Sequence, residues 1–232
     1  MGTLWEKSVS TVLACAAVAM VVILVRREIL AKPSSILQKG EYAKQWKSFA
    51  ESGRTVGDPK APISIVEFSE MQCPYCKKFH ATLKNLELKF PNKLSYTFVH
   101  FPSESHLHAF AASRAAECAS DQDRFRQFLD VAFQHQSQLG KQAWDWFVLQ
   151  AGVPDTAVFA RCMFSTATPP LVTAGIELGK HLKIAGTPTF FLNGWRMNGA
   201  APDSQVVRMV EDLLAHRKPH PDYPDDPLKN NL

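Results

Sequence analysis

The sequence predicts an α/β fold that carries a helical insertion and is preceded by one transmembrane helix. Three observations lead to this prediction. The strand-like run 63–68 leads into the motif Cys73-Pro74-Tyr75-Cys76, which opens a helical run. A second strand-like run, 189–192, follows the dipeptide Thr187-Pro188 far downstream. The third observation is an apolar run over residues 9–25.

The apolar run is interrupted only by Ser10 and Thr11. A helix of this length spans roughly 25 Å, slightly less than the hydrocarbon thickness of a bilayer. A cleaved signal peptide, a lipoprotein signal at Cys15 and an uncleaved anchor are the alternatives. Cleavage at the small residues in the middle of the run would leave apolar residues exposed. We therefore expect a transmembrane anchor over 9–27, with Cys15 as a buried small hydrophobe and 1–8 as its flank.

The remaining chain divides by composition into three further segments. Residues 28–57 are predicted to be a tether with one short helix over 41–51, and residues 58–217 to be the folded domain. Apolar residues recur at helical spacing through about 104–183, which predicts that the insertion is helical. Residues 218–232 are proline-rich and poor in apolar residues, so this tail is expected to be disordered.

Composition limits the classes of partner. With 46% hydrophobic residues, the chain can bury a core without disulfides to hold it together. The net charge is +4, and no basic cluster is interleaved with aromatic residues. The sequence therefore gives no support for a nucleic-acid partner.

The motif Cys73-Pro74-Tyr75-Cys76 carries the chemistry. A sulfur at the N-terminus of a helix is stabilised as a thiolate by free backbone N–H groups and the helix dipole. We expect the Cys73 sulfur to be exposed there, with Cys76 as the buried, resolving thiol. Pro74 suits the first turn, where its missing N–H has no partner. The alternatives are a passive disulfide or half of a zinc site, in which His80 would be a further ligand.

The run Ala61-Pro62-Ile63-Ser64-Ile65-Val66-Glu67-Phe68-Ser69-Glu70-Met71-Gln72-Cys73-Pro74-Tyr75-Cys76 resembles the DsbA-like family of bacterial thiol oxidoreductases. The resemblance covers about residues 56–217. It implies a thioredoxin fold in which Thr187 and Pro188 form a cis-proline loop beside the sulfurs. It also implies protein dithiol–disulfide exchange without an organic cofactor or metal.

Two positions depart from the family pattern. Family oxidases often carry valine where this chain has Thr187, and histidine where it has Tyr75. Tyr75 cannot supply the positive charge of an imidazolium. These departures leave the oxidising strength of the disulfide open and do not affect the dithiol mechanism.

The resemblance suggests roles for three further residues. In proteins of this fold, an acid near the position of Glu67 moves protons to and from the second cysteine. The alternative is an exposed carboxylate at the end of the strand. Because the neighbours Val66 and Phe68 are both apolar, the alternation of side chains does not show whether Glu67 faces the core or the solvent. Cys118 and Cys162 are expected to form a structural disulfide, as in similar family members, rather than two buried thiols. His106 and His108 are assigned to no site.

The predicted function is a monomeric, membrane-anchored thiol–disulfide oxidoreductase on the periplasmic side of a bacterial cell membrane. It would oxidise the cysteine thiols of substrate proteins and pass electrons to a membrane redox partner. Arg26 and Arg27 would place the domain in the cytoplasm by the positive-inside rule, whereas dithiol chemistry favours the outside. The alternatives are a reductase or isomerase of the same fold, and a metal-binding or scaffold module that uses Cys73, Cys76 and His80.

Overall fold

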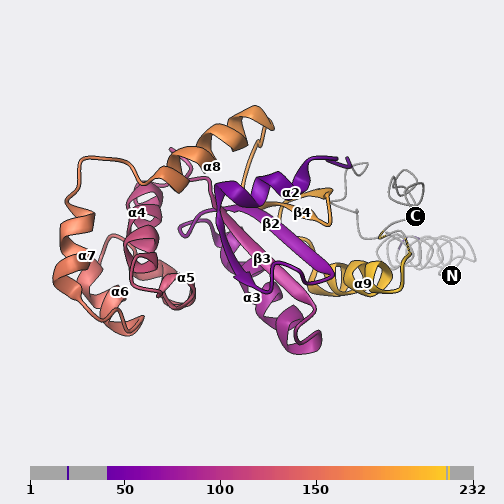
Figure 1. The fold of residues 1–232 in the computed structure, drawn as a ribbon, viewed down its shortest axis with the longest axis horizontal. Helices are drawn as coiled ribbons and strands as arrows, with labels where there is room; N and C mark the ends of the chain where they lie inside the picture. The colour runs from indigo at the N-terminus through magenta and orange to yellow at the C-terminus, as the bar shows by residue number, and fades with distance from the viewer. Residues whose placement is uncertain (1–19, 21–40, 218, 220–232) are drawn as a thin grey trace, which may run out of the picture. The chain divides into compact units, whose positions relative to one another are not determined.

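A computed structural model describes residues 20, 41–217 and 219, and these residues form a mixed five-stranded sheet flanked by helices (Figure 1). The strand order is β1-β3-β2-β4-β5. β2 and β3 are parallel, and the other neighbours are antiparallel. The strands are β1 (Arg54–Gly57), β2 (Ile63–Ser69), β3 (Leu94–His100), β4 (Thr189–Leu192) and β5 (Trp195–Asn198).

After a first short helix and β1, the chain continues as a βαβ unit, the helical insertion, a β-hairpin and a final helix. The described α-helices are α2 (Trp46–Phe49), α3 (Pro74–Lys89), α4 (Ala109–Ser120), α5 (Phe125–Gln134), α6 (Trp144–Gln150), α7 (Thr156–Met163), α8 (Pro170–His181) and α9 (Asp203–Leu214). Two short 3₁₀ helices are η1 (Ala50–Ser52) and η2 (Gln136–Gln138). This arrangement confirms the α/β fold with a helical insertion.

The central strand β2 is buried on both sides because helices cover both faces of the sheet. Successive side chains of a strand point to opposite faces, so Ile65 and Phe68 contribute to different layers. On one face, Phe79 of α3 stacks on Phe190 of β4, with 4.3 Å between ring centroids. On the other, Phe49 of α2 meets Phe191 edge-on. The large apolar cluster of the first face continues into α9 and the helical insertion.

The helical insertion packs as a small bundle of its own. α5 buries one stripe of residues at helical spacing and leaves the others half-buried or exposed, as the sequence pattern predicts. A disulfide joins Cys118 on α4 to Cys162 on α7, over a sequence separation of 44. The buried residues of α5 are Phe125, Phe128, Leu129, Ala132 and Phe133.

The folded domain begins earlier than the sequence indicates. β1 lies inside 28–57, the segment predicted to be a tether, yet it pairs with β3 from Arg54 opposite Phe98. The Arg54 guanidinium also contacts Glu117 of α4 at 2.8 Å. β1 has four half-buried or exposed residues and no apolar alternation, so only its pairing partner reveals it as a strand. The short helix expected over 41–51 is also shorter, comprising α2 and η1.

The two terminal predictions lie outside the part of the chain that the structure describes. These are, apart from residue 20, the anchor over 9–27 and, apart from residue 219, the tail over 218–232. Among the described residues, no helix has the length and apolar character needed to cross a bilayer.

Candidate active site

The two cysteines of the motif lie where the central strand passes into a helix. β2 ends at Ser69, and Cys73 is the N-cap residue of α3 with extended backbone. Pro74 occupies the first turn, where its fixed φ suits the helix and no hydrogen bond is lost. The free N–H groups of this turn face the Cys73 sulfur, so the helix terminus can hold a negative charge there.

The Thr187-Pro188 loop reaches the same point from the other end of the domain. The Thr187–Pro188 peptide bond is cis. The Cys73 thiol donates a hydrogen bond to the Thr187 carbonyl oxygen at 3.3 Å. β4 begins directly after this loop and pairs antiparallel with β2, so the sheet itself brings the two motifs together.

The Cys73 sulfur is more enclosed than the sequence suggests. Cys73 exposes 4% of its surface and Cys76 exposes none, and both are free thiols. The prediction of an exposed first sulfur was therefore wrong. The Thr187 carbonyl covers Cys73 from one side, and a contact of this kind between distant segments is not visible in a local motif.

The environment favours a thiolate at Cys73. The pKa of this thiol is lowered to about 5, chiefly by a hydrogen bond from the Cys76 thiol. The Thr187 side chain and the backbone N–H groups of Tyr75 and Cys76 act in the same direction, while burial opposes them. A group with this pKa is almost fully ionised at neutral pH and is ready to attack or leave as a thiolate.

Cys76 has the opposite character. Its pKa is raised far above the ordinary thiol range because it is buried, and because Glu67 and the Cys73 sulfur disfavour a second negative charge. The two thiols therefore differ strongly in acidity although they are one helical turn apart. Only Cys76 needs to gain a proton when the pair is reduced at neutral pH.

Glu67 lies under this pair on β2, on the face that α3 covers. Its exposed fraction is 1%, so the alternative of an exposed strand-end carboxylate was wrong. Burial raises the pKa of the Glu67 carboxyl to about 8, and a hydrogen bond from Tyr96 opposes this rise. A carboxyl that titrates near neutral pH is suited to proton transfer.

Several residues that the sequence does not single out hold the loop between β2 and α3. The Gln136 side-chain amide donates to the carbonyl oxygens of Met71 and Cys73, each at 2.8 Å. Glu70, buried in this loop, accepts a short hydrogen bond from His106. His106, which the sequence assigns to no site, thus contacts this loop. No local signal identifies Gln136, because it lies in the insertion, far along the chain from the motif.

The residues between the cysteines point outward. Tyr75 exposes 64% of its surface, and Pro74 is also exposed. Tyr75 has no imidazole charge to offer the Cys73 thiolate, as the sequence indicates. The acidity of Cys73 therefore depends on hydrogen bonds and not on a neighbouring cation.

His80 does not join the sulfurs. Its Nε2 lies 2.8 Å from Asp130, and its ring stacks on Phe133. In the part of the chain that the structure describes, no three His, Cys, Asp or Glu side chains are grouped to hold a metal ion.

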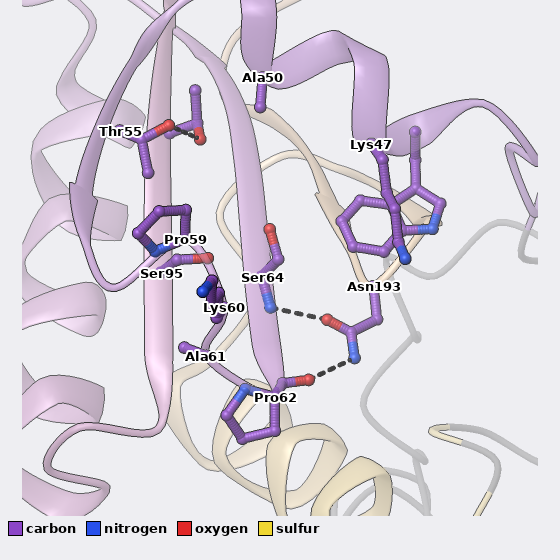
Figure 2. Close-up of a pocket in the computed structure, with 12 residues that line it drawn as sticks. Lys47, Ala50, Thr55, Pro59, Lys60, Ala61, Pro62, Ser64, Ser95 and Asn193 are labelled. Carbon is purple, nitrogen blue, oxygen red and sulfur yellow. Dashed lines mark hydrogen bonds between the residues drawn. The ribbon is translucent and has the colours of Figure 1, made fainter.

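A pocket of about 520 Å³ lies near the other end of the central strand (Figure 2). In Figure 2, the Asn193 amide bridges the backbone of Pro62 and Ser64, at the beginning of β2. Cys73 follows the far end of the same strand, roughly 20 Å away along β2. This pocket is therefore separate from the dithiol site.

Comparison with known proteins agrees with this geometry. A family model described as thioredoxin matches residues 50–212. A periplasmic thioredoxin-like protein from Salmonella enterica serovar Typhimurium is 17% identical, with a TM-score of 0.58 over 75% of this chain and 99% of its own. The α-DsbA1 protein of Wolbachia pipientis is 20% identical, with a TM-score of 0.60 over 71% and 92%.

A curated relative matches only through part of its length. The Na⁺/H⁺ antiporter NhaA 1 of Mycolicibacterium gilvum (strain PYR-GCK) is 30% identical over 158 residues. These residues make up 67% of this chain and 25% of that protein. The chain thus spans about a quarter of the length of the curated relatives it matches.

The sheet presents two thiols of unequal acidity at a helix N-terminus beside a cis-proline loop, an arrangement suited to thiol–disulfide exchange. The chain belongs to the thioredoxin family, because the family model covers most of it. Its fold is that of the DsbA-like proteins, which carry a helical insertion.

Proposed function

We propose that the chain oxidises the cysteine thiols of substrate proteins through a redox disulfide between Cys73 and Cys76. A substrate thiolate attacks Cys73, the Cys73–Cys76 bond breaks, and Cys76 leaves with the electron pair. A second substrate thiolate then attacks the mixed disulfide, and Cys73 leaves. The substrate gains a disulfide and the enzyme gains the two electrons.

The low pKa of Cys73 is the observation that carries this direction of electron flow. A stabilised thiolate stabilises the reduced enzyme, and a stable reduced form makes the disulfide a better oxidant. Tyr75 offers no positive charge to this thiolate, which acts against an extreme potential. We therefore place the enzyme among the oxidases of this fold, with a reductase or isomerase as the alternative.

The proposed location is the extracytoplasmic side of a bacterial cell membrane, with residues 9–25 as the anchor. The Cys118–Cys162 disulfide supports this side, because structural disulfides persist in oxidising compartments. A membrane-impermeant thiol reagent applied to intact spheroplasts is expected to label reduced Cys73. Labelling only after lysis would place the domain in the cytoplasm. The proposed recycling partner is a membrane redox protein, and the proposed assembly is a monomer.

The deciding measurement is the reduction potential of Cys73–Cys76, obtained by equilibration with glutathione. We expect a reduction potential that is less negative than about −270 mV, the value typical of thioredoxin. A potential at or below that value would assign the protein to the reductases.

Cysteine variants test the two roles separately. Cys73→Ser is expected to abolish oxidation of a dithiol peptide, because the attacked sulfur is lost. Cys76→Ser retains the Cys73 thiol and is expected to accumulate mixed disulfides, since its resolving partner is lost. Both variants lack the Cys73–Cys76 disulfide and cannot oxidise the peptide, so trapping distinguishes the two roles. Mixed disulfides in Cys73→Ser, or none in Cys76→Ser, would contradict the assignment.

A further inference from the structure

Glu67 is joined to a tyrosine on the neighbouring strand. The Tyr96 hydroxyl donates a hydrogen bond to Glu67 Oε2 at 2.7 Å, and both side chains are buried. Tyr96 stands opposite Ile65 in the β2–β3 register, so it lies diagonally beside Glu67 on the same face of the sheet. The carboxyl therefore has a hydroxyl group in direct contact that can both donate and accept a proton.

Tyr96 also lines a small cavity of about 10 Å³. A cavity of this size has room for about one water molecule. Lys84, Glu87 and Arg126 line it as well, and their side chains are 51%, 33% and 42% exposed. The cavity thus lies between the buried Tyr96 side chain and charged groups that reach solvent.

The residues that line this cavity lie away from the end of α3 that carries the redox pair. Lys84 and Glu87 lie two to three turns along α3 from Cys76, roughly 12 to 17 Å down the helix axis. A substrate joined to Cys73 covers the N-terminus of α3 and the Thr187 carbonyl. Protons that enter by the cavity would bypass this covered end.

We propose that Tyr96 relays protons between Glu67 and the solvent that reaches this cavity. The proposal rests on the function proposed above. When Cys76 leaves as a thiolate, protonated Glu67 gives it a proton. Tyr96 then gives its hydroxyl proton to the Glu67 carboxylate and takes another from water in the cavity. One proton passes from solvent to Cys76, and Glu67 and Tyr96 end in their initial states.

The charges around Tyr96 suit a relay whose hydroxyl is protonated before and after each transfer. Burial beside the Glu67 carboxyl raises the pKa of the Tyr96 hydroxyl, so it stays protonated at rest. Arg126 forms an ion pair with Glu87, and Lys84 forms one with Asp130, which leaves little net charge at the cavity mouth. The ionisable groups near Tyr96 are Glu67 on β2, then Cys76, His80, Lys84 and Glu87 on α3, and Arg126 and Asp130 on α5.

The test is the rate of proton exchange at Glu67 in the Tyr96→Phe variant of the full chain. Phenylalanine keeps the ring, which packs edge-on against Phe98, and removes only the hydroxyl. A rapid pH jump across the Glu67 pKa of about 8 is followed through the infrared band of the protonated carboxyl. Glu67→Gln identifies this band by its loss. We expect Tyr96→Phe to slow the relaxation by about tenfold or more, since positioned acid–base groups contribute factors of about 10² to 10⁴.

The matched control is Tyr42→Phe, which removes a tyrosine hydroxyl from a ring that packs on Trp195, outside this cavity. Its relaxation rate is expected to equal that of the wild type. A Tyr96→Phe variant that only shifts the midpoint of the Glu67 titration, with an unchanged relaxation rate, would overturn the relay. The jump needs no substrate, so this result is independent of the reduction potential that tests the proposed function.

Discussion

At the scale of single residues, the site depends on a difference in acidity between two neighbouring thiols. Cys73 and Cys76 share one helical turn, yet one is stabilised as a thiolate and the other is kept protonated. Hydrogen bonds converge on the first sulfur, whereas burial dominates at the second. The same two residues can therefore serve as leaving group and proton acceptor in one reaction cycle.

The first residue-scale prediction concerns the titration of Cys73. In the reduced protein, alkylation by iodoacetamide is expected to follow a pKa near 5, because the Cys76 thiol and the helix terminus stabilise the thiolate. Cys76→Ala removes the largest of these contributions and is expected to move the midpoint upward. A wild-type midpoint near 9, the ordinary value, would contradict the proposed environment.

The same shift makes the stability of the reduced protein depend on pH. The folded pKa of Cys73 lies below the unfolded value, so the thiolate contributes its full stabilisation above about pH 9. This contribution is lost as the pH falls towards 5. The oxidised protein lacks this titration, so we expect the gap in melting temperature between the two forms to change over this window. Parallel curves for the oxidised and reduced forms would contradict the shift.

The sequence predicts site residues only where they belong to a local motif. Cys73, Cys76 and Pro188 are visible because their neighbours in sequence are the signal. Glu67 is visible as a spacing, but its burial depends on α3 covering that face. Gln136 and Tyr96 are not visible at all, since their roles arise from contacts made across the fold.

At the scale of elements, the position of α8 shows how a glycine can decide packing. A Cβ atom on Gly175 would lie 2.3 Å from the His100 carbonyl oxygen of β3. Real side chains do not approach a backbone oxygen so closely, and the strand cannot move without breaking its pairing with β2. α8 therefore packs directly on β3 because this residue has no side chain.

Gly175→Ala gives a prediction in which two effects have opposite signs. Helix propensity alone would stabilise the variant by about 1 kcal/mol. The clash with β3 is expected to win, since overpacking costs about 1–3 kcal/mol and the contact is with backbone. Thermal unfolding should show a lower melting temperature. Thr173→Ala, at an exposed position of the same helix, is the control and should change stability little. A raised melting temperature for Gly175→Ala would contradict the packing.

The sequence predicts a helix or strand well where a periodic pattern is long. It fails where a segment becomes a strand only by pairing with another strand. α3, α5 and α9 are amphipathic over many residues, so their periodicity is informative. β1 has four residues and gains its place from β3 and from the contact of Arg54 with Glu117. Such an edge strand is a property of the assembled sheet, and the sequence therefore places it in the tether.

At the scale of the whole molecule, the helical insertion is tied to itself and to the active-site loop. The Cys118–Cys162 disulfide joins α4 to α7, and Gln136 extends from the insertion to the carbonyl of Cys73. A loop of this length, closed by a disulfide, stabilises a protein by about 4 kcal/mol in the chain-entropy account. The disulfide therefore stabilises the helical insertion, which holds the active-site loop through Gln136. The disulfide itself is not part of the active site.

The two disulfides of the oxidised protein are expected to open in sequence when dithiothreitol is added stepwise. Cys73–Cys76 should open first, because the reduced form gains a stabilised thiolate at Cys73. Cys118 is fully buried, and opening its bridge releases the loop constraint without such a gain, so it should open later. Counting free thiols other than Cys15, with mass spectrometry to locate them, should give two at low reductant and two more at high reductant. Cys73→Ser combined with Cys76→Ser is the control and should show only the later pair. Release of Cys118 and Cys162 before the redox pair would show that the insertion is held by packing alone.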